Sequence, residues 1–97
     1  MIVVVVEPNK KPYIKDISNT LEAMQEIVNG HLETVPVHIG DKMFVGVCNG
    51  EGKSSKLELN RVMSGMAIHG TFIIVDYKDF NFKGLKDEDL EFILSNF

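Results

Sequence analysis

Residues 1–6 read MIVVVV, and this β-branched run decides the fold. Such residues are stiff at χ1 and favour a strand over a helix, and the run is far too short to cross a membrane. Because it does not alternate between apolar and polar residues, both faces of the strand should be buried. We therefore expect residues 1–6 to form a central strand of a sheet.

The segments that follow this strand predict a hairpin and then a helix. Residues 7–12 carry turn residues, and residues 13–17 (YIKDI) alternate well enough for a second, more exposed strand that pairs with the first. Asn19, with Glu22 three positions later, matches a capping box, and Gly30 supplies a left-handed stop. Between these ends, apolar residues at helical spacing should pack one helix face on the sheet. They are Leu21, Met24, Ile27 and Val28.

The middle of the chain predicts two more strands. Residues 32–39 alternate, and Pro36 places them at a sheet edge because proline cannot donate a ladder hydrogen bond. Residues 43–48 form another strand, followed by an Asn-Gly-Glu-Gly turn at residues 49–52 that we interpret as a hairpin tip. The periodicity of residues 53–66 does not decide between helix and strand, and we expect a loop with one helical turn.

The last part of the chain predicts a buried strand and a terminal helix. Residues 71–75 (TFIIV) form the strand, which Gly70 introduces. The acidic residues 87–89 complement the N-terminus of a helix. An apolar stripe should dock this helix on the sheet, and it consists of Leu90, Ile93, Leu94 and Phe97.

The composition is that of an ordinary globular protein, with 97 residues of which 44% are hydrophobic and 25% are charged. That length supports one core, so residues 1–97 should form a single α+β domain. We expect a largely antiparallel or mixed five-stranded sheet, with a helix after the second strand and a C-terminal helix packed on it. A domain of this size has modest stability, and self-association into a homo-oligomer would supplement it.

Charge and cysteine content narrow the classes of partner. Fourteen acidic against ten basic residues give a net charge of −4, and no Lys/Arg stripe is present, so direct binding of nucleic acid is not expected. The single cysteine, Cys48, lies in an apolar stretch, which is typical of a reducing compartment. The sequence suggests neither a membrane span nor a signal peptide, so we expect a cytoplasmic protein without a membrane partner.

The motifs that could support catalysis are incomplete. Residues 50–54 (GEGKS) resemble the end of a phosphate-binding P-loop, but the earlier glycine is misplaced, because Val47 holds its position and Gly46 comes one residue too early. Cys48 paired with a histidine, or the histidines grouped with Asp41 around a metal, matches no local signature. We expect neither a metal nor a cofactor. Binding is favoured over catalysis, because no nucleophile, base and stabiliser can be named together.

Two groups of polar residues are candidates for binding. Side chains that flank strand ends and turns can present hydrogen-bond donors to a ligand, and an arginine can clamp a phosphate or carboxylate. These ligand-binding candidates are Asn49, Asn60, Arg61, His69 and Thr71. Acidic residues of the terminal helix could form a face for a basic protein partner, although such charge runs are usually only solvated. These partner candidates are Asp87, Glu88, Asp89 and Glu91.

The order of several segments carries a family resemblance. The segments are IVVVVEP at residues 2–8, LEAMQEIVNG at 21–30, VCNGEGK at 47–53, LNR at 59–61 and GTFIIV at 70–75. Together they resemble an uncharacterised family, a domain of unknown function found in small accessory proteins of phages, plasmids and Gram-positive bacteria. The resemblance covers nearly the whole chain, although the stretch before GTFIIV is shorter than is usual. It implies no established activity, cofactor or catalytic residue.

The resemblance implies an accessory protein of a mobile element that acts in the cytoplasm of a bacterial host cell. Small acidic proteins of this kind often occupy a component of host defence, so the first hypothesis is a non-enzymatic protein that binds and blocks a host protein. The second is a sponge that sequesters a small nucleotide signal at subunit interfaces, with Asn60, Arg61 and Thr71 as donors. The third is a structural or regulatory accessory subunit.

Overall fold

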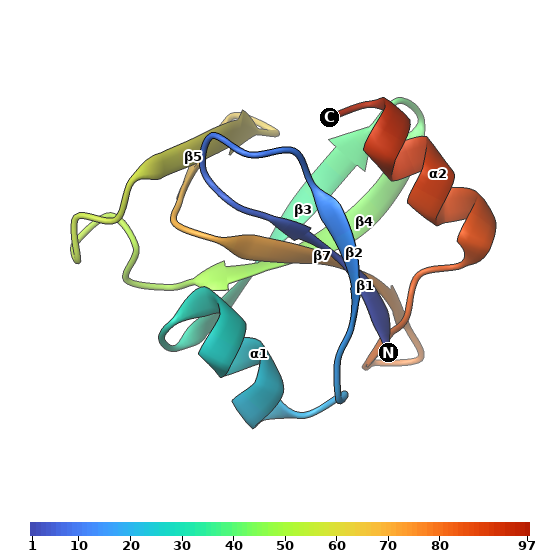
Figure 1. Ribbon diagram of the computed structural model, residues 1–97, viewed down its shortest axis with the longest axis horizontal. Helices are drawn as coiled ribbons and strands as arrows, with labels where there is room; N and C mark the ends of the chain where they lie inside the picture. The colour runs from blue at the N-terminus through green and yellow to red at the C-terminus, as the bar shows by residue number, and fades with distance from the viewer.

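The computed structural model describes residues 1–97 and is built around a sheet of six strands in which every neighbouring pair is antiparallel (Figure 1). Five strands follow one another across the sheet, and a short sixth strand pairs with the third of them. In spatial order they are β2 (Tyr13–Asp16), β1 (Ile2–Val6), β7 (Phe72–Lys78), β4 (Lys42–Asn49) and β3 (Leu32–Ile39), with β8 (Asn81–Lys83) on β7. The α+β fold expected from the sequence is confirmed.

The valine run forms an interior strand whose two faces are buried, as predicted. Val4 and Val6 belong to one core cluster, and Val3 and Val5 belong to a second cluster on the other face of the sheet. The middle position of the sheet belongs to β7 and not to β1, because β1 has the exposed strand β2 on its outer side. The expected hairpin of β1 and β2 is present, with Val4 opposite Ile14.

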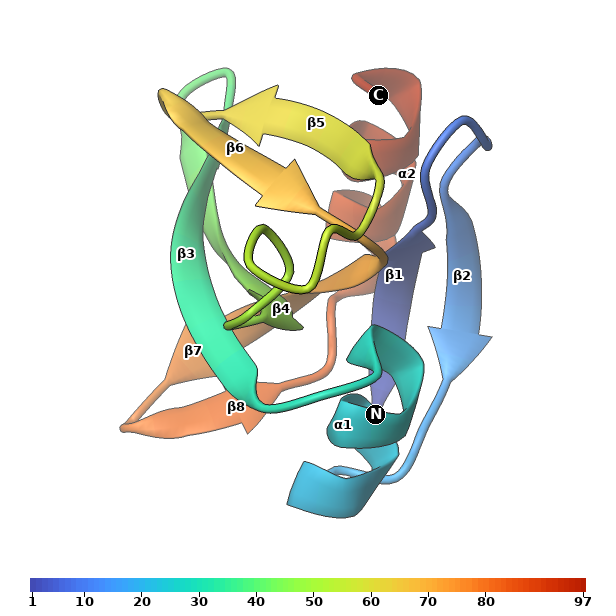
Figure 2. The ribbon, with the colours of Figure 1, turned by 90° about the vertical axis from the view of Figure 1, so that its left-hand side faces the viewer.

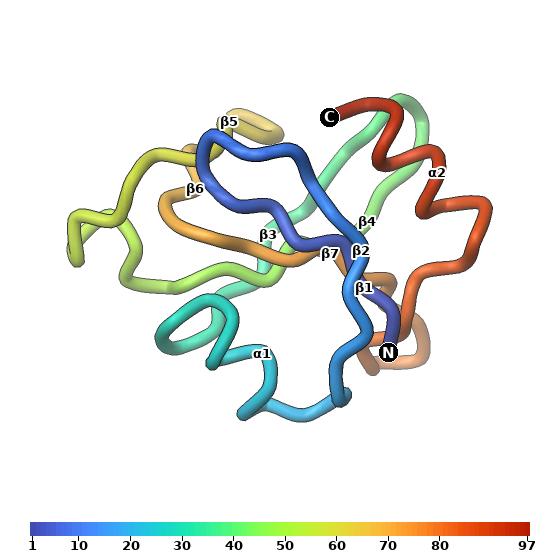
Figure 3. The backbone as a smooth tube through the Cα atoms, in the orientation of Figure 1, coloured from blue at the N-terminus to red at the C-terminus, as the bar shows by residue number.

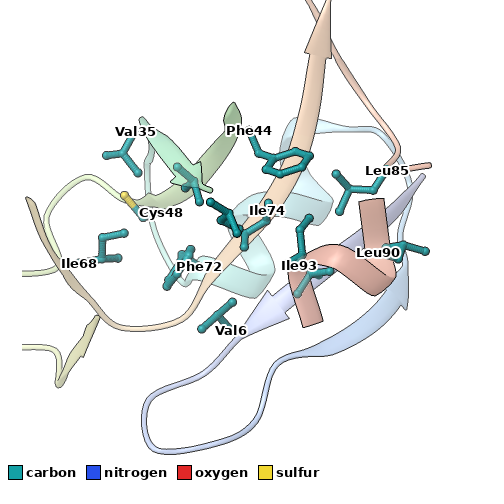
Figure 4. Close-up of a cluster of buried hydrophobic side chains, with 13 residues drawn as sticks. Val6, Val35, Phe44, Cys48, Ile68, Phe72, Ile74, Leu85, Leu90 and Ile93 are labelled. Carbon is teal, nitrogen blue, oxygen red and sulfur yellow. The ribbon is translucent and has the colours of Figure 1, made fainter. Parts of the chain in front are cut away.

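Helices cover opposite faces of the sheet, so the core has two parts (Figure 1). The larger cluster contains 13 buried residues and includes Leu90 and Ile93 of α2 (Asp87–Ser95), packed against sheet residues such as Phe72 and Ile74 (Figure 4). The smaller cluster contains seven and includes Met24 of α1 (Leu21–Val28). Burying apolar area on both faces supplies the main favourable free energy of folding. Neither helix has the length and apolar character needed to cross a membrane.

Helix α1 lies where the sequence placed it, but its caps are different residues. The hydroxyl of Thr20 accepts a hydrogen bond from the Ala23 amide at 3.2 Å, whereas the Asn19 side chain donates to the Phe82 carbonyl at 3.0 Å. The left-handed stop is Asn29, with φ 62°, one residue before the glycine expected there. Asparagine is one of the few residues besides glycine that adopt this conformation, and the backbone amide of Asn29 donates to the Gln25 carbonyl at 2.7 Å. Leu21, expected on the packed face, is 53% exposed because it is the first residue of the helix.

The segment expected to be a loop with one helical turn folds as a second, two-stranded sheet. It consists of β5 (Leu59–Met63) and β6 (Met66–His69), joined by a turn at Ser64 and Gly65 (Figure 2). Residues 50–56 form turns that lead into this ribbon, so the interpretation of residues 49–52 as a hairpin tip was wrong. The ribbon lies beside the loop between β1 and β2 (Figure 3) and places Ile68 in the larger core cluster.

The two edges of the sheet differ in how they are protected. Strand β3 forms one edge and carries Pro36, as expected, and a proline at an edge prevents another strand from pairing there. Strand β2 forms the other edge, and all four of its residues are exposed. Its exposed side chains include Tyr13 and Ile14. This edge therefore lacks the protection that Pro36 gives to its counterpart.

Candidate functional site

Two of the ligand-binding candidates hold the fold together through their side-chain amides. Asn49, at the end of β4, donates through Nδ2 to the carbonyls of Val28 and Asn29 at 3.3 and 3.0 Å, and its Oδ1 accepts from the amide of Glu51 at 2.8 Å. The same amide explains Gly30, because a Cβ at that position would lie 2.6 Å from Nδ2 of Asn49. Asn49 thus ties the C-terminus of α1 to the turn after β4.

Asn60 performs the same task for the β5–β6 ribbon. Its Nδ2 donates to the carbonyl of Val6 at 2.8 Å and to that of Gly70 at 2.9 Å. These two carbonyls belong to the end of β1 and to the connection before β7, so a single amide joins the ribbon to the main sheet. Both of its donor hydrogens are therefore engaged within the chain.

Arg61 is partly buried and its guanidinium is also engaged. Nη1 donates to the carbonyl and to Oδ1 of Asn60 at 3.1 and 3.0 Å, and Nη2 donates to the carbonyl of Lys10 at 3.4 Å. The guanidinium carbon lies 5.9 Å from the centre of the Phe97 ring. Arg61 also lines a hollow of about 370 Å³ together with His38 and Phe97. Arg61 is therefore the one positively charged side chain among the ligand-binding candidates, and it lines a hollow.

The remaining ligand-binding candidates line other hollows. His69 places Nδ1 3.0 Å from the Leu57 carbonyl and shares a small hollow of about 140 Å³ with Asn49. Thr71 borders a larger space between β2 and α1. The five candidates thus share no single hollow, and the structure brings together Asn49 with His69 and Asn60 with Arg61 only.

The space beside Thr71, which we name the α1 groove, is the largest hollow at about 420 Å³. It runs between β2 and α1, and its charged lining contains Glu7, Glu26 and Lys15. Tyr13 also lines it, and burial, together with the hydrogen bond and negative charge of Glu7, raises the pKa of the Tyr13 phenol. The groove therefore offers charges of both signs and no single dominant recognition element.

The four partner candidates on α2 do not behave alike. Asp89 is only 13% exposed and accepts a hydrogen bond from Nζ of Lys42 at 2.9 Å. This hydrogen bond and the charge of Asp89 raise the pKa of Lys42, and the ammonium also lies 5.0 Å from the centre of the Phe92 ring. Asp89 is therefore neutralised by an internal partner. Asp87, Glu88 and Glu91 are exposed and make no ion pair with a lysine or arginine.

A second large hollow, which we name the α2 cleft, lies between α2 and the edge strand β2. It has a volume of about 410 Å³. Its lining residues are Ile14 of β2 and Asp87, Leu90, Glu91, Leu94 and Ser95 of α2. The four helix residues from Asp87 to Leu94 recur at intervals of three and one, so they occupy one face of the helix. The cleft thus combines apolar side chains with two carboxylates.

The acidic residues of this cleft were among the partner candidates predicted from the sequence, but Ile14 was not. The sequence predicted an exposed strand that contains this isoleucine, and an apolar side chain on an exposed strand was the available signal. That Ile14 and α2 line the same hollow was not predictable from the local pattern, because Ile14 and Leu90 lie 76 positions apart in the sequence.

Cys48 lies in the larger core cluster and is 6% exposed, as expected for a small core residue. Burial raises the pKa of its thiol, and the nearby negative charge of Glu33 raises it further. The sulfur lies 3.5 Å from the Glu33 carbonyl. A buried thiol that keeps its proton is a poor nucleophile. No group of three or more His, Cys, Asp or Glu side chains is placed to hold a metal ion.

The chain matches a family model described as "Domain of unknown function (DUF3846)" over residues 1–97. No curated protein and no solved structure matches the chain.

Proposed function

The chain belongs to the DUF3846 family of domains of unknown function, and from its surface we propose that it is a non-enzymatic binding protein that takes a basic protein partner on α2. The observation that carries this proposal is the α2 cleft, in which Ile14 and Leu94 supply apolar area beside the carboxylates of Asp87 and Glu91. Apolar area provides affinity when it is buried, and uncompensated charge at its rim selects the partner.

Charge on this helix supports the same function. Its first turn is acidic and its last turn carries no basic residue, so no cation of the helix itself offsets the exposed carboxylates. Long-range attraction from such a face accelerates association with a positively charged partner. In the mobile-element setting that the family resemblance implies, the partner would be a host protein whose basic surface the helix blocks.

The nucleotide-sponge hypothesis has less support from the site. The amides of Asn49 and Asn60 are engaged in hydrogen bonds that join elements of the fold, and a ligand would have to displace them. Breaking a satisfied internal hydrogen bond costs stability that ligand binding would have to recover.

A charge-reversal variant tests the proposed function. Asp87→Lys/Glu88→Lys/Glu91→Lys removes the exposed carboxylates of α2 and leaves the Lys42–Asp89 pair intact. Tagged protein would be expressed in bacteria that carry active defence systems, crosslinked, purified and quantified by mass spectrometry. We expect the recovery of the specific partner to fall at least about tenfold, which corresponds to about 1.4 kcal/mol of binding free energy.

A matched control separates a specific site from a change in net charge. Glu22→Lys/Glu33→Lys/Glu51→Lys changes the charge by the same amount at exposed positions away from the α2 cleft. It should retain the partner, and binding to the wild type should weaken with added salt because exposed charges are screened. Equal recovery of the partner by the α2 variant and the wild type would contradict the proposed function.

A further inference from the structure

The strand that forms one wall of the α2 cleft has an unpaired edge. Strand β2 pairs only with β1, and Figure 2 shows no strand on its outer side. The amide of Ile17 donates to the carbonyl of Met1 at 2.9 Å. Met1 and Ile17 are therefore a hydrogen-bonded residue pair of the antiparallel ladder between β1 and β2. Hydrogen-bonded pairs alternate along such a ladder, so Lys15 and Tyr13 also direct their amides and carbonyls toward β1.

The same alternation directs the backbone of the intervening residues outward. Ile14 and Asp16 face β1 in non-hydrogen-bonded positions, so their N–H and C=O groups point away from the sheet. No other backbone or side-chain group of the chain bonds to them. Two donors and two acceptors are therefore arranged at the spacing that another β-strand requires.

The side chains of β2 line two hollows, one on each face of the sheet at this edge. Ile14 points to the α2 face and lines the α2 cleft, whereas Tyr13, Lys15 and Ile17 point to the opposite face and line the α1 groove. Successive side chains of a strand placed beside β2 would alternate between these two faces. Each face has room beside it, about 410 Å³ on one side and about 420 Å³ on the other.

From this arrangement we propose that the partner of the α2 face is an extended segment that adds as an antiparallel strand to β2, with basic and apolar side chains alternating toward the α2 cleft. Main-chain hydrogen bonds to Ile14 and Asp16 provide the strand pairing, and side-chain contacts provide selectivity. Charge complementarity sets the partner's sequence, because Asp87 and Glu91 select lysine or arginine, and the exposed apolar surface of Ile14 and Leu94 selects an aliphatic residue. This inference rests on the proposed function and specifies its binding mode.

The test uses a synthetic peptide as the probe, fluorescein-labelled TKTLTKT, in which lysine and leucine share one face of the strand. We expect saturable binding to the full-length chain by fluorescence anisotropy, with a Kd in the micromolar range. In an antiparallel pair, residues that exchange hydrogen bonds have their side chains on the same face. N-methylation of the lysines and leucine should therefore weaken binding at least tenfold, whereas N-methylation of the threonines should leave it unchanged.

Two further measurements locate the peptide. On binding, amide hydrogen exchange at Ile14 and Asp16 should slow, because these amides gain partners, whereas Tyr13 and Lys15 are already bonded to β1. Asp87→Lys/Glu91→Lys should weaken binding at least tenfold, and Glu22→Lys/Glu33→Lys, which changes the net charge equally, should not. A scrambled peptide of the same composition, TKTKLTT, should bind at least tenfold more weakly because its leucine lies on the opposite face of the strand from its lysines.

Several results would overturn the inference. The absence of binding up to millimolar peptide, or an equal effect of the two N-methylation patterns, would exclude strand addition. The reversed pattern would exclude an antiparallel strand with its lysines and leucine toward the α2 cleft. Protection of Ile14 and Asp16 that rises with protein concentration alone would assign the edge to a second copy of the chain. If the charge-reversal variant loses its cellular partner while the peptide fails, the proposed function stands and only the strand mode falls.

Discussion

At the scale of single residues, the polar side chains show why residue type alone does not identify a binding site. Asn60 was predicted as a ligand-binding candidate, yet its side-chain amide donates to the backbone carbonyls of Val6 and Gly70. Buried and half-buried polar groups are nearly always paired within the protein. Asp89 follows the same principle through Lys42, whereas Asp87 and Glu91 have no such partner.

Phe80 is a residue whose conformation predicts a change in stability. It forms a two-residue turn with Asp79 between β7 and β8, and the φ angles of Asp79 and Phe80 are 55° and 64°. A hairpin turn with two positive φ angles favours glycine at its second position, and Phe80 is 92% exposed, so its ring gains little from packing. Phe80→Gly should stabilise the protein by about 0.5–1 kcal/mol, since relief of left-handed strain exceeds the entropy cost of glycine.

Urea unfolding of Phe80→Gly and Phe80→Ala would check this expectation. The alanine variant removes the ring but keeps the strain of a Cβ at positive φ, so its free energy of unfolding should stay within about 0.5 kcal/mol of the wild type. A glycine variant that is less stable than the wild type would show that the ring contributes to packing.

At the scale of elements, the α1 helix shows which of two neighbouring polar residues starts a helix. Both Asn19 and Thr20 are suitable N-caps by type, and the capping-box spacing favoured Asn19. The structure assigns the cap to Thr20, since the Asn19 side chain is directed across the sheet to Phe82 of β8. A tertiary contact therefore moved the start of the helix by one residue.

This pair of residues gives a matched mutational test. Thr20→Ala removes the hydroxyl that accepts from the Ala23 amide and should lower the free energy of unfolding by about 1 kcal/mol. Asn19→Ala removes one exposed hydrogen bond to a carbonyl and should cost about 0.5 kcal/mol or less. Chemical denaturation of both variants measures the difference. A larger loss of stability in Asn19→Ala than in Thr20→Ala would indicate that Asn19 is the N-cap, as the sequence pattern predicted.

At the scale of the whole molecule, folding raises the pKa of three ionisable groups. The pKa values of Cys48, Tyr13 and Lys42 are all raised, the first two mainly by burial and the third by its hydrogen bond to Asp89. A group with a raised pKa keeps its proton in the folded state at a pH where the unfolded chain has lost it. The folded state then binds more protons, so stability falls as the pH rises.

We therefore expect the free energy of unfolding to be constant near pH 8 and to fall above about pH 9, where the thiol of the unfolded chain ionises. The contribution of Cys48 to this slope is at most about 1.4 kcal/mol per pH unit. Urea titrations at several pH values would measure it, and Cys48→Ala should lower overall stability but flatten the slope. A stability that rises between pH 8 and 10, or an identical slope in the variant, would contradict this assignment.

Much of the fold is predictable from the sequence because the local pattern of apolar and polar residues indicates which side chains are buried. The continuous apolar runs at residues 2–6 and 72–75 predicted strands inside a sheet, and residues 3–6 and 72–75 are buried. Alternation at residues 32–39 and Pro36 identified an edge strand, since side chains alternate between faces and proline cannot pair. Helix periodicity with acidic first-turn residues identified α2. Each of these properties depends on residues within one element.

The tertiary structure alone decided which distant residues meet. Residues 59–69 form a two-stranded ribbon although their periodicity favours neither helix nor strand. The ribbon buries Ile68 in the larger core cluster, and that burial depends on residues elsewhere in the chain. The tertiary structure engaged Asn49 and Asn60 inside the fold, and it brought Ile14 beside Leu90 to form the α2 cleft at an open sheet edge. The sequence supplied the carboxylates of this site, but the pairing of a helix with a particular strand edge depends on packing between elements, which no local pattern encodes.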